Sequence, residues 1–376
     1  MPDDDMFSWG DSVFNDEHVL ELDYLPEAFL HRDEQMETLK YALRPAVRGS
    51  RPLDVMARGP PGTGKTTAVQ KLFDELTSVS DVDVVRVNCQ VDSTRYAVFS
   101  RLFEGLFRYE PPSSGISFKR LFAQITNHLI EEGEVLVVAL DDVNYLFYED
   151  EADDTLYSLL RAHEAHSEAK VGVIVISSDL DLDIIDELDS RVESVFSPEE
   201  TYFHAYEKDE ISEILQLRVE RGFKEGAIGT RVVDQIAEYT ESSGGDLRVG
   251  IDLLRRSGLN AEMRGSTTVS TDDVEEAYQN AKLVYLRRQA RGLSGYSRRL
   301  FRIICIRNKT NEKTTKGTIR GEFVDSTDAG GDEFLRNLET LEQLGLATVE
   351  DAENGSGTSG SEVKPAFEPD EVLDIL

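Results

Sequence analysis

Residues 59–66 read Gly59-Pro60-Pro61-Gly62-Thr63-Gly64-Lys65-Thr66, which has the G-x-x-x-x-G-K-T spacing of a phosphate-binding loop. The loop follows the apolar residues 53–57 and precedes the amphipathic stretch 67–76, so it joins a predicted strand to a predicted helix. In that setting backbone N–H groups and the helix N-terminus surround a phosphate, Lys65 neutralises the β- and γ-phosphates, and Thr66 ligates Mg²⁺. We therefore expect this loop, together with Thr67, to bind ATP or ADP with Mg²⁺.

Short apolar runs alternate with helical patterns from residue 53 to about residue 196. The runs at 84–87, 135–140 and 171–176 are rich in valine, isoleucine and leucine, as strands buried on both faces are. Strands that alternate with helices predict a parallel sheet covered on both sides. The fold class expected from this pattern is α/β.

Two carboxylates, Asp141 and Asp142, directly follow the apolar run 135–140. A carboxylate in that place lies beside the phosphate-binding loop, so we expect Asp141 to bind Mg²⁺ and Asp142 to orient the attacking water. Hydrolytic enzymes of this type commonly carry glutamate in the second place, and the side chain of Asp142 is one methylene shorter. We therefore expect slow hydrolysis.

Changes of pattern divide the chain into four parts. Residues 1–17 are polar and acidic and predict a flexible tail, and residues 18–198 contain the predicted sheet with its phosphate-binding loop. Residues 199–285 are helical in pattern throughout. Residues 286–376 end in a helical stretch, a strand, a Gly/Ser-rich loop and a second strand, which is the outline of a winged helix.

The composition favours a halophilic source. The chain has 376 residues and a net charge of −33, and only 12 of its 40 basic residues are lysine. In molar salt the screening length falls to about 3 Å, so a surface crowded with hydrated carboxylates stays soluble. The alternative interpretation is an acidic protein that avoids nucleic acid.

Segments for export or membrane insertion are absent from the pattern. No apolar run reaches about 18 residues, and the N-terminus lacks the basic and then apolar order of a secretory signal. We expect a cytoplasmic protein without a membrane partner. Cys89 and Cys305 share no C-x-x-C spacing, so both are expected to be buried small apolar residues.

Residues 286–320 are the exception to the acidic composition. They contain eleven basic residues and one acidic residue, Glu312. A concentrated basic surface beside a winged-helix pattern is typical of phosphate-backbone binding, so we expect DNA contact here. The candidate DNA-binding residues are Arg298, Arg299, Arg302, Arg307, Lys309, Lys313, Lys316 and Arg320.

The candidate recognition helix, 331–344, has a mixed character. It offers Arg336, Asn337, Thr340 and Gln343 to DNA but also carries four acidic residues. The loop 354–361, in the place of the wing, contains no lysine or arginine. We add Arg336 to the candidate DNA-binding residues, and we expect DNA binding more strongly than the reading of a specific sequence.

Several motifs outside the phosphate-binding loop carry a family resemblance. They are Tyr24-Leu25-Pro26, His31-Arg32-Asp33-Glu34-Gln35, Val87-Asn88-Cys89, Asp92-Ser93-Thr94-Arg95-Tyr96, Gly245-Asp246-Leu247-Arg248 and Asp252-Leu253-Leu254-Arg255. With them, the chain from about residue 20 to about residue 285 resembles the archaeal replication initiators, AAA+ ATPases of the origin-recognition and cell-division-cycle type. The resemblance implies an AAA+ base domain at 18–198, a helical lid at 199–285, and a winged helix at 286–376 that binds double-stranded origin DNA.

The resemblance also implies roles for five further residues. Ser178 stands where relatives place a polar sensor of the γ-phosphate, often asparagine, and a hydroxyl has the shorter reach. Arg191 matches the arginine finger offered to the nucleotide of a neighbouring subunit. Arg248 matches the lid arginine that reaches the γ-phosphate of its own nucleotide. Tyr206 and Arg218 match lid positions beside the adenine and the phosphates.

The function expected from all of this is an ATP-dependent replication initiator at the nucleoid, in which ATP binding and slow hydrolysis switch the conformation around origin DNA. The resemblance adds two partners, a replicative helicase and a second copy contacted through Arg191. One alternative is a non-catalytic paralogue that regulates, because Asp142 and Ser178 both depart from the stronger catalytic pattern. Another is a clamp-loader subunit, which would end in a helical collar instead of the strand–loop–strand pattern found here.

Overall fold

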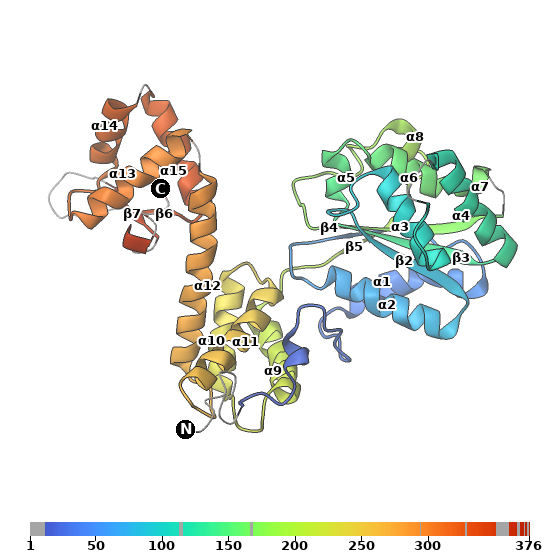
Figure 1. Cartoon of the computed structure of the whole chain (residues 1–376), viewed down its shortest axis with the longest axis horizontal. Coiled ribbons are helices and arrows are strands. Elements are labelled where there is room, and N and C mark those ends of the chain that lie inside the picture. The colour runs from blue at the N-terminus through green and yellow to red at the C-terminus, as the bar shows by residue number, and fades with distance from the viewer. Residues whose placement is uncertain are drawn as a thin grey trace, which may run out of the picture. The chain divides into compact units, whose positions relative to one another are not determined.

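The computed structural model describes residues 12–112, 116–165, 168–293, 295–327, 329–350, 361–366, 369–371, 373 and 376. The chain forms two compact units, Met1–Val274 and Glu275–Leu376, and each is described by itself (Figure 1). Residues 1–11 of the predicted tail and residues 354–360 of the predicted wing lie outside the described residues.

The first unit is built on a five-stranded parallel sheet in the order β2-β3-β4-β1-β5. Its strands are β1 (Val55–Arg58), β2 (Val82–Asn88), β3 (Val135–Asp141), β4 (Lys170–Ser177) and β5 (Glu199–Tyr202). Alternate residues of β3 join opposite apolar clusters, since Leu136 and Val138 pack on one face and Val137 on the other. A strand buried on both faces has no polar side to show, which explains the unbroken apolar run. The predicted α/β class is confirmed.

Helices cover both faces of this sheet (Figure 1). One face packs against α1 (Asp33–Leu43) and α2 (Lys65–Val79). The other packs against α3 (Arg95–Phe107), α4 (Phe118–Glu132), α5 (Asn144–Tyr148), α6 (Ala152–Leu160), α7 (Ala162–Ala165) and α8 (Ser190–Glu193). Because the strands are parallel, their carboxyl ends meet at one edge, and the phosphate-binding loop and Asp141 both lie there.

The helical segment after β5 consists of α9 (Lys208–Gly222), α10 (Thr230–Ser242), α11 (Leu247–Met263) and α12 (Thr271–Gly292), which continues into the second unit. A capping box between Glu207 and Glu210 begins α9. The side chain of Asp246 caps α11 by accepting a hydrogen bond from the backbone N–H of Arg248. This cap fixes the start of α11, which carries Arg248.

The N-terminal segment corrects one expectation. The sequence predicted a flexible tail over 1–17, but Val13 and Phe14 are buried, and the chain continues into the short 3-10 helix η1 (Glu17–Leu20). The Phe14 ring lies 4.8 Å from the ring of Phe223, and a Cβ on Gly258 would approach Phe14 to 2.3 Å. The prediction was wrong for residues 12–17 because the acidic neighbours hid a short apolar anchor.

The second unit contains α13 (Gly295–Lys309), α14 (Lys316–Ser326), α15 (Gly331–Gln343) and an antiparallel pair, β6 (Ala347–Glu350) with β7 (Glu362–Pro365). Three aromatic residues, Phe301, Phe323 and Phe334, form the centre of its core. Thr315, just before α14, bridges to Glu362 and extends the small sheet. Three helices beside a small antiparallel sheet are the winged-helix arrangement that the terminal pattern predicted.

The two cysteines behave as expected. Cys89 and Cys305 are both fully buried, and burial raises the pKa of each thiol. Both are therefore unreactive small core residues. In the part of the chain that the structure describes, no helix is both long enough and apolar enough to cross a membrane.

Thermal stability is expected to depend strongly on salt. Among the described residues, the only buried carboxylic acids are Asp54, Asp141 and Asp273, so nearly all the negative charge lies at the surface. Lowering KCl lengthens the range over which these carboxylates repel one another, and the melting temperature should fall steadily from molar KCl to dilute buffer. Circular dichroism melts over a KCl series measure it. A melting temperature that does not change with KCl would contradict the halophilic interpretation.

Candidate functional site

The phosphate-binding loop runs from the end of β1 to the start of α2 and depends on its glycines. Gly62 and Gly64 have φ angles of 70° and 90°, in the left-handed region that glycine adopts without strain. A Cβ on Gly62 would lie 1.7 Å from Oδ1 of Asp246, and the backbone N–H of Leu247 donates to the Gly62 carbonyl at 3.3 Å. The loop is thus in direct contact with the start of α11.

Lys65 is held inside the loop. Its side chain is almost fully buried, and Nζ donates to the carbonyls of Gly59 and Pro60, both at 2.7 Å. Burial lowers the pKa of this amine to about 8, although the charges of Asp142 and Asp141 oppose the shift. A partly desolvated amine that faces backbone carbonyls interacts strongly with any anion placed on the loop.

Thr66 and Asp141 meet at the edge of the sheet. The Thr66 hydroxyl lies 3.2 and 3.1 Å from the two carboxylate oxygens of Asp141. Hard oxygen donors of this kind suit Mg²⁺, so the two residues fit the metal role predicted for them. Nη1 of Arg86 also donates to Asp141, at 3.1 Å, from the neighbouring strand β2.

Asp142 and Ser178 face the same cavity. It has a volume of about 750 Å³. Asp142 has a φ angle of 53°, and burial together with the charge of Asp141 raises the pKa of its carboxyl. The predicted residues that line the cavity are Gly62, Thr63, Gly64, Lys65, Thr66, Thr67, Asp142, Ser178, Tyr206, Arg218 and Arg248.

The helical segment supplies the opposite wall. Arg248 donates from Nε and Nη2 to the carboxylate of Asp246, at 2.9 and 2.6 Å, and this bond raises the pKa of Arg248. Arg218 is engaged differently, since it donates to the Val19 carbonyl and its guanidinium lies 4.6 Å from the centre of the Tyr24 ring. Arg218 therefore fixes the N-terminal segment that forms part of the wall.

Arg32 contacts the phosphate-binding loop, a role that its motif, His31-Arg32-Asp33-Glu34-Gln35, did not predict. Its side chain is buried, and it donates to the carbonyls of Thr63 at 3.0 Å and His204 at 2.7 Å. Its guanidinium also lies 3.7 Å from the centre of the Tyr206 ring. Arg32 thereby joins the phosphate-binding loop to the connection that leads into α9.

Arg191 lies away from this cavity. Its side chain is exposed, pairs with Asp189, and stacks 5.4 Å from the centre of the Tyr157 ring. Asp189 also caps α8, so the arginine stands on a fixed support. Its exposure leaves it accessible to another molecule, as the arginine-finger role implied by the family resemblance would require.

The cavity, the parallel sheet and the helical wall agree with what the comparisons with known proteins show. Residues 55–183 match the AAA domain family, and residues 212–279 match the Cdc6 AAA+ ATPase-type lid domain. The chain is 61% identical over 376 residues to ORC1-type DNA replication protein 3 of Haloarcula marismortui, covering all of this chain and 99% of that protein. The chain belongs to the ORC1-type DNA replication proteins.

Other relatives and structures agree with this assignment. ORC1-type DNA replication protein 2 of Methanosarcina acetivorans is 44% identical over 100% of this chain and 99% of its own length. A solved structure of the Aeropyrum pernix ORC1 protein in complex with DNA has the same fold, with a TM-score of 0.72 and 23% identity over 97% of both chains. The resemblance stated from the motifs is confirmed, and so is the halophilic affinity, since Halobacterium salinarum also supplies a relative, at 59% identity.

In the winged helix of this ORC1-type protein, most of the basic residues that were predicted to bind DNA are exposed to solvent. Arg299 and Arg302 lie one turn apart on α13 and are both exposed. Lys309, Lys313, Arg320 and Arg336 are exposed as well, while Arg298 and Lys316 are partly buried. The side chain of Arg336 on α15 is 71% exposed, and it pairs with Glu333 at 2.8 Å.

The predicted DNA-binding residue Arg307, and Asn337 of the candidate recognition helix, have hydrogen-bond partners inside the winged helix. Arg307 donates to the Lys313 carbonyl at 2.9 Å and to Glu322 at 2.6 Å, so it ties α13 to α14. Asn337 accepts a hydrogen bond from the Ser297 hydroxyl at 2.6 Å, which joins α15 to α13. The exposed pair Arg299 and Arg302 is therefore a better candidate for phosphate contact than Arg307.

Proposed function

We propose that this ORC1-type protein is an ATP-dependent replication initiator that binds double-stranded origin DNA and uses ATP binding and slow hydrolysis as a conformational switch. One observation carries the proposal: the phosphate-binding loop touches the start of the lid helix α11 at Gly62, Asp246 and Leu247. A ligand on the loop and the position of the lid are therefore coupled by direct contact.

In this proposal the site residues have separate roles in phosphoryl transfer. Backbone N–H groups of the loop and the Lys65 amine would hold the phosphates, and Thr66 and Asp141 would hold Mg²⁺, whose charge would stabilise the transferred phosphoryl group. Asp142, Ser178 and Arg248 all line the cavity, so Asp142 could orient the water, while Ser178 from the sheet and Arg248 from the lid could contact the terminal phosphate. Arg248 bonds Asp246, which lies against Gly62 of the loop, so movement of Arg248 toward a phosphate would break its bond to a residue that contacts the loop.

Nucleotide affinity should depend on pH through Lys65. The pKa of its amine is about 8 without ligand, and a bound phosphate favours the protonated form and raises that pKa. ATP affinity should therefore be constant below about pH 8 and fall by up to tenfold per pH unit above it. Calorimetry between pH 7 and pH 9.5 measures this. Lys65→Arg, which stays charged, should give a flat profile, and a flat wild-type profile would contradict the assignment.

Turnover should be slow and should depend on Asp142. We expect a wild-type rate well below the typical enzyme median of about 10 s⁻¹, because the short carboxylate reaches the water poorly. Asp142→Asn should lower this rate at least about tenfold and leave ATP affinity nearly unchanged, since general-base assistance contributes about 10²–10⁴-fold. The control is Asp181→Asn, an exposed carboxylate that does not line the cavity. Fast turnover that is indifferent to Asp142→Asn would refute the role.

The second candidate function is a regulator without catalysis. It is favoured by the identity of Asp142 and Ser178, because both residues depart from the stronger catalytic pattern. Such a protein would bind ATP and DNA as proposed but show no turnover above that of the Asp142→Asn variant. The same assay therefore separates the two candidates. In either case the winged helix would hold DNA. The Aeropyrum pernix ORC1 protein, which has the same fold, was solved in complex with DNA.

The experiment that tests the proposal as a whole is the mapping of chromosomal binding sites in ATP and in ADP. An initiator should concentrate at few sites, near replication origins, and should redistribute when ATP is replaced by ADP. Binding that is uniform along the chromosome would contradict it. Recruitment of a replicative helicase, contact between copies through Arg191, and a cytoplasmic location at the nucleoid belong to the same proposal.

A further inference from the structure

Three side chains outside the nucleotide cavity converge near the amino ends of strands β2 and β3, away from the carboxyl ends where the phosphate-binding loop lies. Asp83 is the second residue of β2, His128 lies in the last turns of α4, and Glu134 immediately precedes β3. Val82 pairs with Val135, so the two carboxylates start neighbouring strands side by side. Asp141 ends the strand that Glu134 precedes, and the seven residue steps between these two positions span about 23 Å at about 3.3 Å per residue.

The end of α4 explains why His128 meets Glu134. Gly133, with a φ angle of 71°, ends the helix in the left-handed conformation, and its N–H bonds back to Ile130 and Leu129. The chain reverses there, and the backbone N–H of Glu134 donates to the Leu129 carbonyl at 3.2 Å. This turn places Glu134 beside the last turns of α4, which carry His128.

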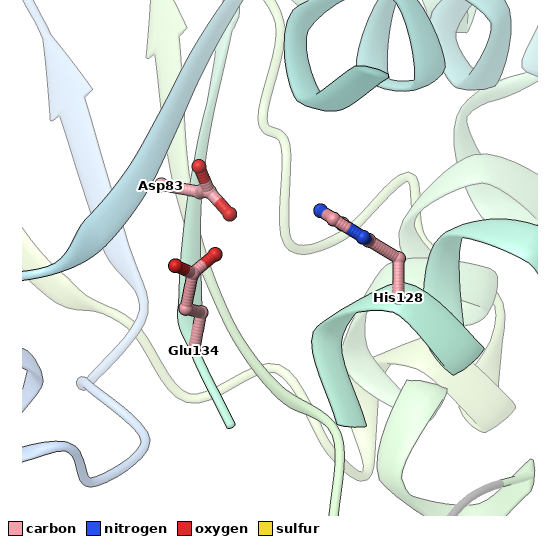
Figure 2. Close-up of side chains that lie close together, drawn as sticks. All are labelled: Asp83, His128 and Glu134. Carbon is pink, nitrogen blue, oxygen red and sulfur yellow. The ribbon is translucent and has the colours of Figure 1, made fainter. Parts of the chain in front are cut away.

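The geometry of the three groups is that of a potential ligand set. One ligand atom from each residue lies within 4.8 Å of the other two, and all three residues are half-buried. The two carboxylates lie next to each other, and the imidazole is directed toward them (Figure 2). Packing against Phe107, at 4.6 Å between ring centres, holds the imidazole in this orientation.

Among the described residues, one buried carboxylate oxygen of this cluster has no hydrogen-bond donor. Oδ2 of Asp83 is buried and has no hydrogen-bond partner among the described residues. A buried carboxylate oxygen without a donor is costly, and a second carboxylate beside it adds repulsion. A cation placed between the three side chains would satisfy both groups at once.

We propose that Asp83, His128 and Glu134 bind one divalent first-row transition cation, with Zn²⁺ as the probe. One imidazole and two carboxylates favour such an ion over Mg²⁺ or Ca²⁺, which prefer oxygen alone. Bonds of about 2.0–2.2 Å require the ligand atoms to close by about 1 Å. The bound ion would tie the edge strand β2 to α4 and shield an edge of the sheet from pairing.

Zinc binding by the full-length chain tests this proposal. Calorimetry in molar KCl with excess Mg²⁺, which occupies weak carboxylate sites, should show one Zn²⁺ per chain. His128→Gln should weaken that binding at least about tenfold, and His163→Gln, on a neighbouring helix, should leave it unchanged. No zinc binding by the wild type, or equal binding by His128→Gln, would overturn the proposal.

A second variant keeps the test decisive if His128→Gln folds poorly. Glu134→Gln preserves shape and can donate a hydrogen bond to Asp83, so its fold should be retained. Saturating Zn²⁺ should raise the melting temperature of the wild type by at least about 3 °C and leave that of Glu134→Gln unchanged. If the carboxyl pair instead shares a proton, Zn²⁺ will move neither melting temperature, and the proposal fails.

Discussion

The Lys65→Ala variant should bind ATP at least about a hundredfold more weakly than the wild type. The amine is nearly buried, donates to the loop carbonyls of Gly59 and Pro60, and lies in the loop that we propose binds the phosphates. A hydrogen bond to a charged group contributes about 1.5–3 kcal/mol, and 1.4 kcal/mol is a factor of ten in affinity. Two phosphate contacts therefore account for a loss of this size. Calorimetry in molar KCl measures it directly.

The matched control for this variant is Lys40→Ala. Lys40 lies on α1, pairs with Glu75 at 3.8 Å, and does not line the cavity. Its removal should leave ATP affinity unchanged, and circular dichroism should show that both variants keep their helices. If Lys65→Ala binds ATP as tightly as Lys40→Ala does, the loop is not a nucleotide site and the proposed switch has no ligand.

The second large effect concerns DNA. Changing Arg299 and Arg302 together to alanine should weaken binding to every duplex sequence alike, because phosphates carry no sequence information. The slope of log affinity against log salt should shrink by up to about 0.9 per lost contact. The measurement requires a KCl series in which the protein stays folded. Changing Arg44 and Arg48, an exposed pair of arginines in the base domain, to alanine is the control.

Substitution of Arg336 should change DNA binding in a different way from substitution of Arg299 and Arg302. It is the one arginine or lysine in α15, its side chain is largely exposed, and arginine commonly pairs with guanine in the major groove. Arg336→Ala should therefore change the preference among sequences more than the overall affinity. If the Arg299 and Arg302 variant keeps the wild-type affinity and slope, α13 is not the DNA surface. If Arg336→Ala keeps the wild-type preference, the sequence is read by another element.

Most of the fold was predictable because its signals are local. The run 135–140 must be buried on both faces, and Asp141 must then lie at the carboxyl edge beside the loop, so strand order was not needed to place them together. The terminal helix and strand pattern indicated the winged helix in the same way.

The contacts that were missed depend on tertiary register. Arg86 reaches Asp141 only because β2 pairs with β3, and a single arginine within an apolar strand was the signal that could have revealed it. Arg32 acts through carbonyls of residues 63 and 204, which no spacing rule brings together. The assignment of Arg307 to DNA treated a basic cluster as one surface, whereas its side chain ties two helices together.

The N-terminal segment gives the lid a second attachment to the base domain. The first attachment is the chain between β5 and α9, and the second is the segment in which Phe14 packs on Phe223 and Val19 accepts a bond from Arg218. The lid is therefore joined to the base domain by two stretches of chain that are far apart in the sequence, and a chain shortened to begin at residue 21 would keep only the first of them.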